Sequence, residues 1–74
     1  MIKQGKWYKH VSSDEYLISI NGEYYKTCDR GWKRWSEMKV RTLEQVVFHN
    51  PVASLANYVQ VDEVPFEFRL QALN

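Results

Sequence analysis

The fold is decided by residues 16–28, which read YLISINGEYYKTC. Two runs rich in β-branched and aromatic residues flank Asn21-Gly22, and such runs favour strands. Asn followed by Gly is typical of a two-residue type I′ hairpin turn, because both residues tolerate positive φ angles. The turn predicts a register in which Ile20 lies opposite Glu23 and the pairing continues residue by residue away from the turn.

The segment before this hairpin carries a second turn signal, Ser12-Ser13, after a strand that begins at Trp7. If this turn also has two residues, alternation divides the side chains between two faces of a sheet. The predicted core face consists of Trp7, Val11, Tyr16, Ile18, Ile20 and Tyr25. The opposite face is half polar, so we expect it to meet water or a partner. It consists of Tyr8, His10, Glu15, Leu17, Ser19, Tyr24, Lys26 and Cys28.

Two further strands are predicted later in the chain. A turn signal at residues 29–31, Asp-Arg-Gly, precedes a strand from Trp32 to Met38. Apolar residues alternate with polar ones from Phe66 to Ala72, after a turn at residues 62–65. This alternation predicts a C-terminal strand that joins the same sheet.

Helix signals occupy the region between these strands. Residues 42–45, Thr-Leu-Glu-Gln, have the pattern of a capping box, which predicts a short helix to about His49. Asn50-Pro51 then ends this helix and can start a second one, with Asn50 as its N-cap. The second helix carries an apolar stripe for packing on the sheet, formed by Val52, Leu55, Ala56 and Val59.

The length of 74 residues is too short for two hydrophobic cores, so we expect one domain over residues 1–74. A hydrophobic fraction of 45% and a charged fraction of 26% are typical of a globular protein. The expected fold class is α+β. It combines an antiparallel β-meander of three to four strands, two short helices packed on one face, and a C-terminal strand that completes the sheet.

Cysteine usage and hydropathy indicate the compartment. Cys28 is the single cysteine, so no internal disulfide can form, which favours a reducing, intracellular setting. The sequence shows neither a signal peptide nor an apolar run long enough to span a membrane. We therefore expect a soluble, cytoplasmic protein without membrane partners.

Catalytic and metal-binding signatures are weak. The predicted register places His10, Glu15 and Cys28 side by side, and these are the groups that nucleophilic catalysis uses. No motif surrounds Cys28, and ordinary cross-strand packing is the alternative that we favour. The two histidines and Cys28 lack the close spacing of zinc ligands, and no glycine-rich phosphate loop is present. We expect no enzymatic activity, no metal and no cofactor.

Charge and aromatic residues gather in the first part of the chain. Residues 1–41 contain nine of the ten Lys and Arg residues, all three Trp and four of the five Tyr, and their net charge is +4. Residues 42–74 carry a net charge of −3. Such a polarised chain can steer an acidic partner toward one face, although its total charge is only +1.

The predicted binding surface combines the half-polar sheet face with the segment around residues 30–35, because Trp and Arg are enriched at binding hot spots. It consists of Tyr8, Tyr24, Lys26, Arg30, Trp32, Lys33 and Arg34. The alternative is that one Trp lies in the core and the charges guard a sheet edge against aggregation.

The leading hypothesis is a non-enzymatic interaction protein that binds and modulates a protein or nucleoprotein with an acidic surface, as phage-encoded inhibitors of host enzymes or defence complexes do. The competing hypothesis is a nucleic-acid-binding module, in which cations contact phosphates and aromatic rings stack on bases. A pI near 7.9 argues against strong nucleic-acid binding. Two copies of the chain can also pair as a homodimer through an edge strand that charge does not guard.

Overall fold

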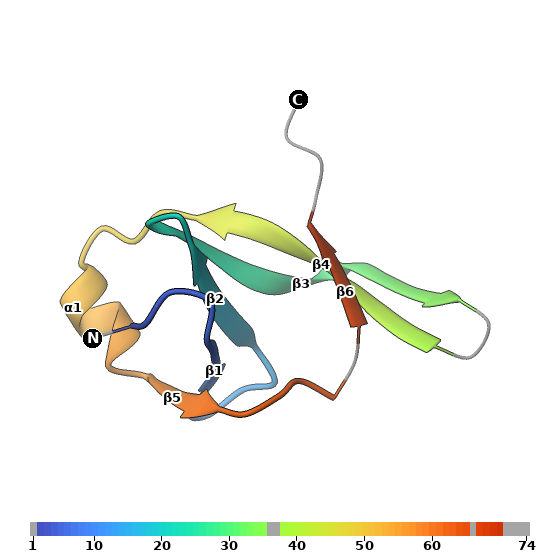
Figure 1. Cartoon of the computed structure of the whole chain (residues 1–74), viewed down its shortest axis with the longest axis horizontal. Coiled ribbons are helices and arrows are strands. Elements are labelled where there is room, and N and C mark those ends of the chain that lie inside the picture. Colours follow the sequence, from blue (N-terminus) through green and yellow to red (C-terminus); the bar gives the residue numbers. More distant parts are fainter. Residues whose placement is uncertain (1, 36–37, 66, 71–74) are drawn as a thin grey trace.

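The computed structural model describes residues 2–35, 38–65 and 67–70, with side chains described within residues 2–27 and 41–65. In these ranges it contains one helix and six strands (Figure 1). The elements are β1 (Trp7–His10), β2 (Tyr16–Ile20), β3 (Glu23–Trp35), β4 (Met38–Val46), α1 (Pro51–Leu55), β5 (Tyr58–Val61) and β6 (Glu67–Leu70). No helix of the described ranges is long and apolar enough to cross a membrane.

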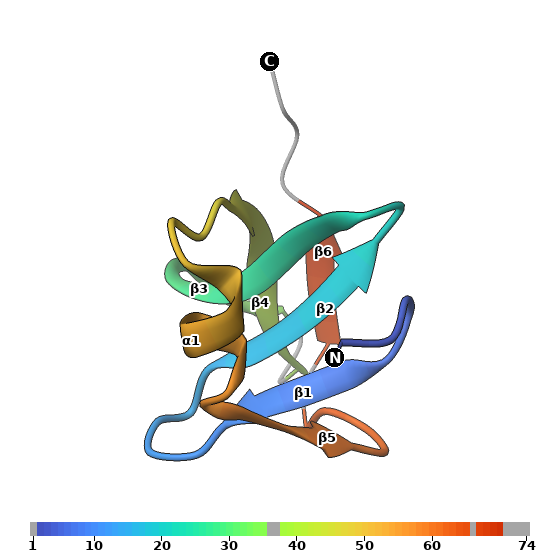
Figure 2. The ribbon, with the colours of Figure 1, turned by 90° about the vertical axis from the view of Figure 1, so that its left-hand side faces the viewer.

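The strands form one curled sheet in the order β5-β1-β2-β3-β4-β6. Neighbouring strands are antiparallel, except that β6 runs parallel to β4. Figure 2 shows β6 behind β1 and β2, whereas α1 lies on the opposite side of these two strands. The sheet therefore has an inner face, toward β6, and an outer face, on which α1 lies.

The hairpin between β2 and β3 has the predicted turn and register. Asn21 and Gly22 have φ angles of 52° and 82°, as a type I′ turn requires. Ile20 pairs with Glu23, and the pairing continues to Leu17 and Lys26, which confirms the prediction. The register between β1 and β2 also agrees with a two-residue turn at residues 12–13. Tyr8 lies opposite Leu17, as that turn implies.

The inner face holds the core cluster of buried hydrophobic residues. Ile18, Tyr25 and Leu43 are buried together, and Trp7 and Ile20 pack against them. Four of these five residues belong to the predicted core face, and Leu43 joins them because β4 places it opposite Thr27 of β3. Leu43 is only 1% exposed.

The predicted two-helix α+β fold is wrong, because the first of the two helices is absent from the described structure. Residues 42–45, which resemble a capping box, lie in β4 and pair with residues 25–28 of β3. In the strand, Leu43 enters the core and Lys26 stands opposite Glu44, an arrangement that stabilises a sheet. A short isolated helix offers no comparable burial, so pairing with β3 overrides the local capping signal.

The second predicted helix is also largely replaced by other structure. It begins as expected, with the Asn50 side chain accepting a hydrogen bond from the Ala53 amide, but it ends at Leu55. The following residues form β5 and pair with β1. The predicted apolar stripe does not roof the core, because no residue of α1 is buried and Val52 is 84% exposed.

The expected turn at residues 29–31 lies inside a strand. β3 runs without interruption to Trp35, and its pairing with β4 shifts in register between Cys28 and Lys33. Gly31 falls within this irregularity, as glycine in a strand often marks a bulge. The strand predicted from Trp32 to Met38 is therefore divided between the end of β3 and the start of β4, and residues 36–37 lie outside the described ranges.

We predict that Leu43→Ala lowers the free energy of unfolding by about 2 to 5 kcal/mol, because it leaves a cavity in the core cluster of the inner face. Urea denaturation followed by tryptophan fluorescence measures this loss. The matched control is Val47→Ala, directly after β4, where the side chain is 80% exposed. This control should cost less than about 0.5 kcal/mol, and similar losses in both variants would contradict the assignment of the core.

Candidate functional site

A groove lies on the outer face, between α1 and the sheet. It has a volume of about 530 Å³. Its walls come from the N-terminal segment, β1, β3, α1 and β5, and they are lined by Ile2, Tyr8, Tyr24, Pro51, Val52, Leu55, Ala56 and Tyr58. The mainly apolar side chains around this groove make it suited to apolar contacts rather than to polar chemistry.

The two predicted site tyrosines on the outer face have different surroundings. Tyr8 is buried, and its hydroxyl accepts a hydrogen bond of 2.9 Å from the backbone amide of Lys3. Tyr24 is half-buried and its ring packs against Phe48, with the ring centroids 5.6 Å apart. The outer face was predicted to be open, but Tyr8, Leu17 and Ser19 are buried on it. Tyr8 therefore offers a partner little surface.

A polar cluster adjoins this groove on the same face. The Tyr58 hydroxyl donates a hydrogen bond to the Glu15 carboxylate, and Lys26 Nζ lies 3.9 Å from the same carboxylate oxygen. The His10 ring meets the Tyr58 ring edge-on, with centroids 5.1 Å apart. Lys26, another predicted site residue, is thus partly exposed and already interacts with a carboxylate of its own chain.

The surroundings of Tyr58 change its acidity. Burial raises the pKa of Tyr58, and the hydrogen bond to Glu15 and the negative charge of Glu15 raise it further. Both effects oppose the charged phenolate. Tyr58 therefore stays a neutral hydrogen-bond donor to Glu15 over the physiological pH range.

The structure describes only part of the group of His10, Glu15 and Cys28, for which the sequence favours cross-strand packing over catalysis. His10 ends β1 and Glu15 directly precedes β2; the two residues lie opposite each other, as predicted, and the His10 amide donates to the Glu15 carbonyl oxygen at 2.9 Å. Their side chains are directed elsewhere, since His10 Nδ1 lies 3.2 Å from the amide and the hydroxyl of Ser12. The Cys28 side chain lies outside the described part. Within that part, no group of three metal-ligating side chains comes together.

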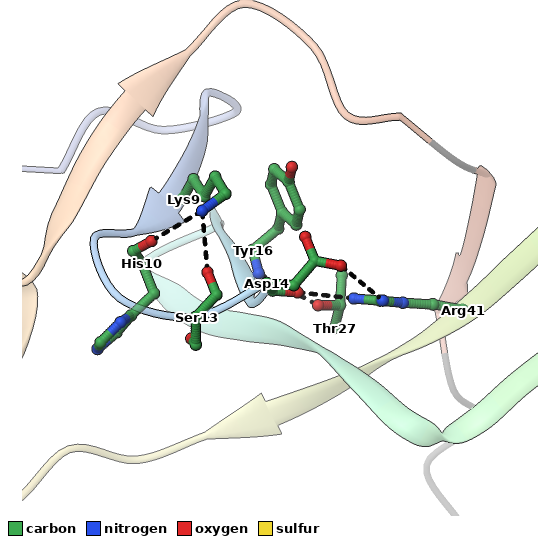
Figure 3. Close-up of polar contacts among 7 residues, drawn as sticks. All are labelled: Lys9, His10, Ser13, Asp14, Tyr16, Thr27 and Arg41. Carbon is green, nitrogen blue, oxygen red and sulfur yellow. Dashed lines mark hydrogen bonds and ion pairs between the residues drawn. The ribbon is translucent and has the colours of Figure 1, made fainter.

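The loop between β1 and β2 is fixed by basic side chains (Figure 3). The Arg41 guanidinium donates to the carbonyl oxygen of Asp14 at 2.8 Å and pairs with its carboxylate at 3.1 Å. Lys9 Nζ donates to the carbonyl oxygens of His10 and Ser13, at 3.2 and 3.0 Å. The Arg41 guanidinium, which follows residues 30–35 in sequence, is therefore bound to the loop of its own chain.

The remaining predicted site residues lie on a two-stranded arm, formed by residues 29–35 of β3 and 38–39 of β4. Beyond Cys28, the described part of β3 pairs with β4 alone. Figure 1 shows these two strands extending past β6 at the end of the molecule opposite α1. The backbone places Arg30, Trp32, Lys33 and Arg34 on the arm, and their side chains lie outside the described part.

The structure therefore divides the predicted surface between the outer face, with its groove and polar cluster, and the arm. Tyr8 and Tyr24 line the groove, Lys26 belongs to the polar cluster, and the other four residues lie on the arm. No local pattern in the sequence indicates that Tyr58 takes part, because its position depends on the long-range pairing of β5 with β1.

No known family matches this chain, and comparison with curated proteins and with solved structures finds no similar protein.

We predict that Tyr58→Phe makes the stability of the protein less sensitive to alkaline pH. Because the pKa of Tyr58 is higher in the folded chain than in the unfolded chain, its contribution is complete below pH about 10 and is lost as the pH rises further. Urea midpoints measured between pH about 9 and about 11.5 should fall more steeply for the unmodified protein than for Tyr58→Phe. Equal slopes would show that Tyr58 and Glu15 do not interact as described. Glu15→Gln, which keeps the tyrosine, should give an intermediate slope.

Proposed function

We propose that this protein is a non-enzymatic interaction protein that binds an acidic surface of another protein or nucleoprotein through the arm. The observation that supports this proposal is the departure of β3 and β4 from the body of the sheet beyond Cys28. In the described backbone, the arm pairs with no strand other than its own two, whereas β2 and the first part of β3 contribute to the core.

The sequence of the arm has the composition of a binding segment. Residues 29–39 contain four basic and two acidic side chains, a net charge of +2, together with two of the three Trp residues. Trp and Arg supply large contact area and fixed hydrogen-bond geometry, and they are the commonest hot-spot residues. Positive charge steers the arm toward acidic surfaces and raises the association rate.

Binding by this arm would modulate the partner by occupying its surface, as small inhibitor proteins do. We place this interaction in the cytoplasm, because a single cysteine suits a reducing compartment.

Nucleic acid is the second candidate partner, and the shape of the arm favours it. A two-stranded antiparallel ribbon fits the major groove of DNA, and some DNA-binding proteins read sequence in this way. The charge of the chain supports this candidate less well, since a net charge of +1 allows few phosphates to be neutralised.

We predict that the double variant Lys33→Glu, Arg34→Glu stays folded and loses its partner. The matched control is Lys3→Glu, Lys6→Glu, which changes the net charge equally at two exposed positions off the arm. Affinity capture from the native host, with and without nuclease treatment, compares the three proteins. A protein that survives nuclease, and that only the arm variant fails to retain, supports the proposal. Equal capture by both variants would remove the arm from the interface.

We further predict a salt test that separates the two candidates. If the arm binds nucleic acid, fluorescence anisotropy with a labelled duplex should show an affinity that falls steeply as salt rises, because binding releases condensed counterions. No measurable affinity for the duplex even at low salt would exclude the second candidate and leave the first intact.

A further inference from the structure

The edge of the sheet at β5 has backbone groups that point away from the protein. In the described ranges β5 pairs only with β1. The Val11 amide donates to the Asn57 carbonyl oxygen at 2.9 Å, so the groups of residue 57 point toward β1. Backbone groups alternate in direction along an antiparallel pair. Val59 therefore bonds toward β1, and the N–H and C=O groups of Tyr58 and Gln60 point outward.

The pairing of β1 with β2 gives the same assignment independently. The His10 amide donates to the carbonyl oxygen of Glu15, the residue before β2, so the next residue back along β1, Lys9, must direct its backbone groups to the other side. Lys9 is the residue opposite Val59. Both observations thus leave the outward edge at Tyr58 and Gln60.

This edge lacks charge, proline and bulges, which are among the features that prevent strands from associating; its length of 4 residues is the one such feature that it has. Natural edge strands are commonly protected by charged residues, proline or bulges. β5 has the sequence Tyr-Val-Gln-Val, with neither charge nor proline, and it pairs with β1 without a register shift. Val59, in its centre, is 52% exposed.

We propose that a second copy of this chain binds this edge, so that two β5 strands pair antiparallel about a two-fold axis at Val59. In this register, Tyr58 lies opposite Gln60 of the partner subunit, and the reverse pair follows by symmetry. Both pairs exchange their outward groups, which gives about four backbone hydrogen bonds. The two Val59 side chains meet at the axis as a close, non-hydrogen-bonded pair. This dimer is independent of the function proposed for the arm.

The charges of the chain favour a second copy as the occupant. Self-association brings together two molecules whose net charge is only +1, so long-range repulsion is small. β5 itself carries no charge, and the acidic residues Asp62 and Glu63 follow it, so in the proposed register they lie beyond the paired residues 58–60 of the other copy. No like charges therefore face each other across the axis. Because the paired segment is short, the dimer should be weak and concentration-dependent.

Sedimentation equilibrium of the purified chain over a wide range of concentrations tests the proposal. The average mass of the unmodified protein should rise from monomer toward dimer. Val59→Lys places two ammonium groups at the axis and should raise the dimer dissociation constant by about tenfold or more. The matched control is Val47→Lys, because Val47 is also exposed but lies away from β5; it should dimerise like the unmodified protein.

A second variant removes a donor without adding charge. Gln60→Pro deletes an outward amide, so it should abolish dimerisation while preserving the pairing of β5 with β1. Circular dichroism and urea denaturation establish that each variant is folded. The proposal is overturned if the unmodified chain stays monomeric at all concentrations, as expected if the edge binds only a different peptide. It is equally overturned if a folded Gln60→Pro protein dimerises like the unmodified one.

Discussion

The positive φ angles of Asn21 and Gly22 impose a constraint on which the rest of the structure depends. A type I′ turn of two residues fixes the register of β2 against β3, and a shift by one residue would turn Ile18 and Tyr25 out of the core. Each further strand takes its orientation from its neighbour. The inward position of Leu43 in β4 thus follows from a turn that lies far from it in sequence.

A chain of 74 residues has few side chains with which to cover a core. In this protein the sheet curls, so that its own strands cover the inner face. Helix α1 contributes little buried surface to the core, because it has only five residues and none of them is buried. It lies on the outer face, where it leaves the groove beside Tyr24 and Leu55. The curled sheet still has two edge strands, β5 and β6. An edge strand is a site where another strand can add to the sheet.

Local signals predicted the parts of the fold that short-range physics controls. The turn at Asn21-Gly22 and both hairpin registers followed from sequence, since turn length determines pairing. Residues 42–45 were misassigned because a capping box is a weak local preference, whereas pairing with β3 buries Leu43. β5 was missed for the same reason, since only its distant partner β1 makes Tyr58–Val61 a strand. The burial of Tyr8 was equally hidden, because it depends on which face the N-terminal segment and α1 cover.

Strand β3 explains how one small sheet can carry two surfaces of different character. Its first part pairs on both sides and contributes Tyr25 to the core. Beyond the register shift, a segment with Arg30, Lys33 and Arg34 would have to desolvate several charges if it folded back into the body, which is unfavourable. The irregular pairing between Cys28 and Lys33 interrupts the ladder, so this segment leaves the body while its last residues still pair with β4. The cationic arm and the uncharged β5 edge are thereby separated, and one can be occupied without blocking the other.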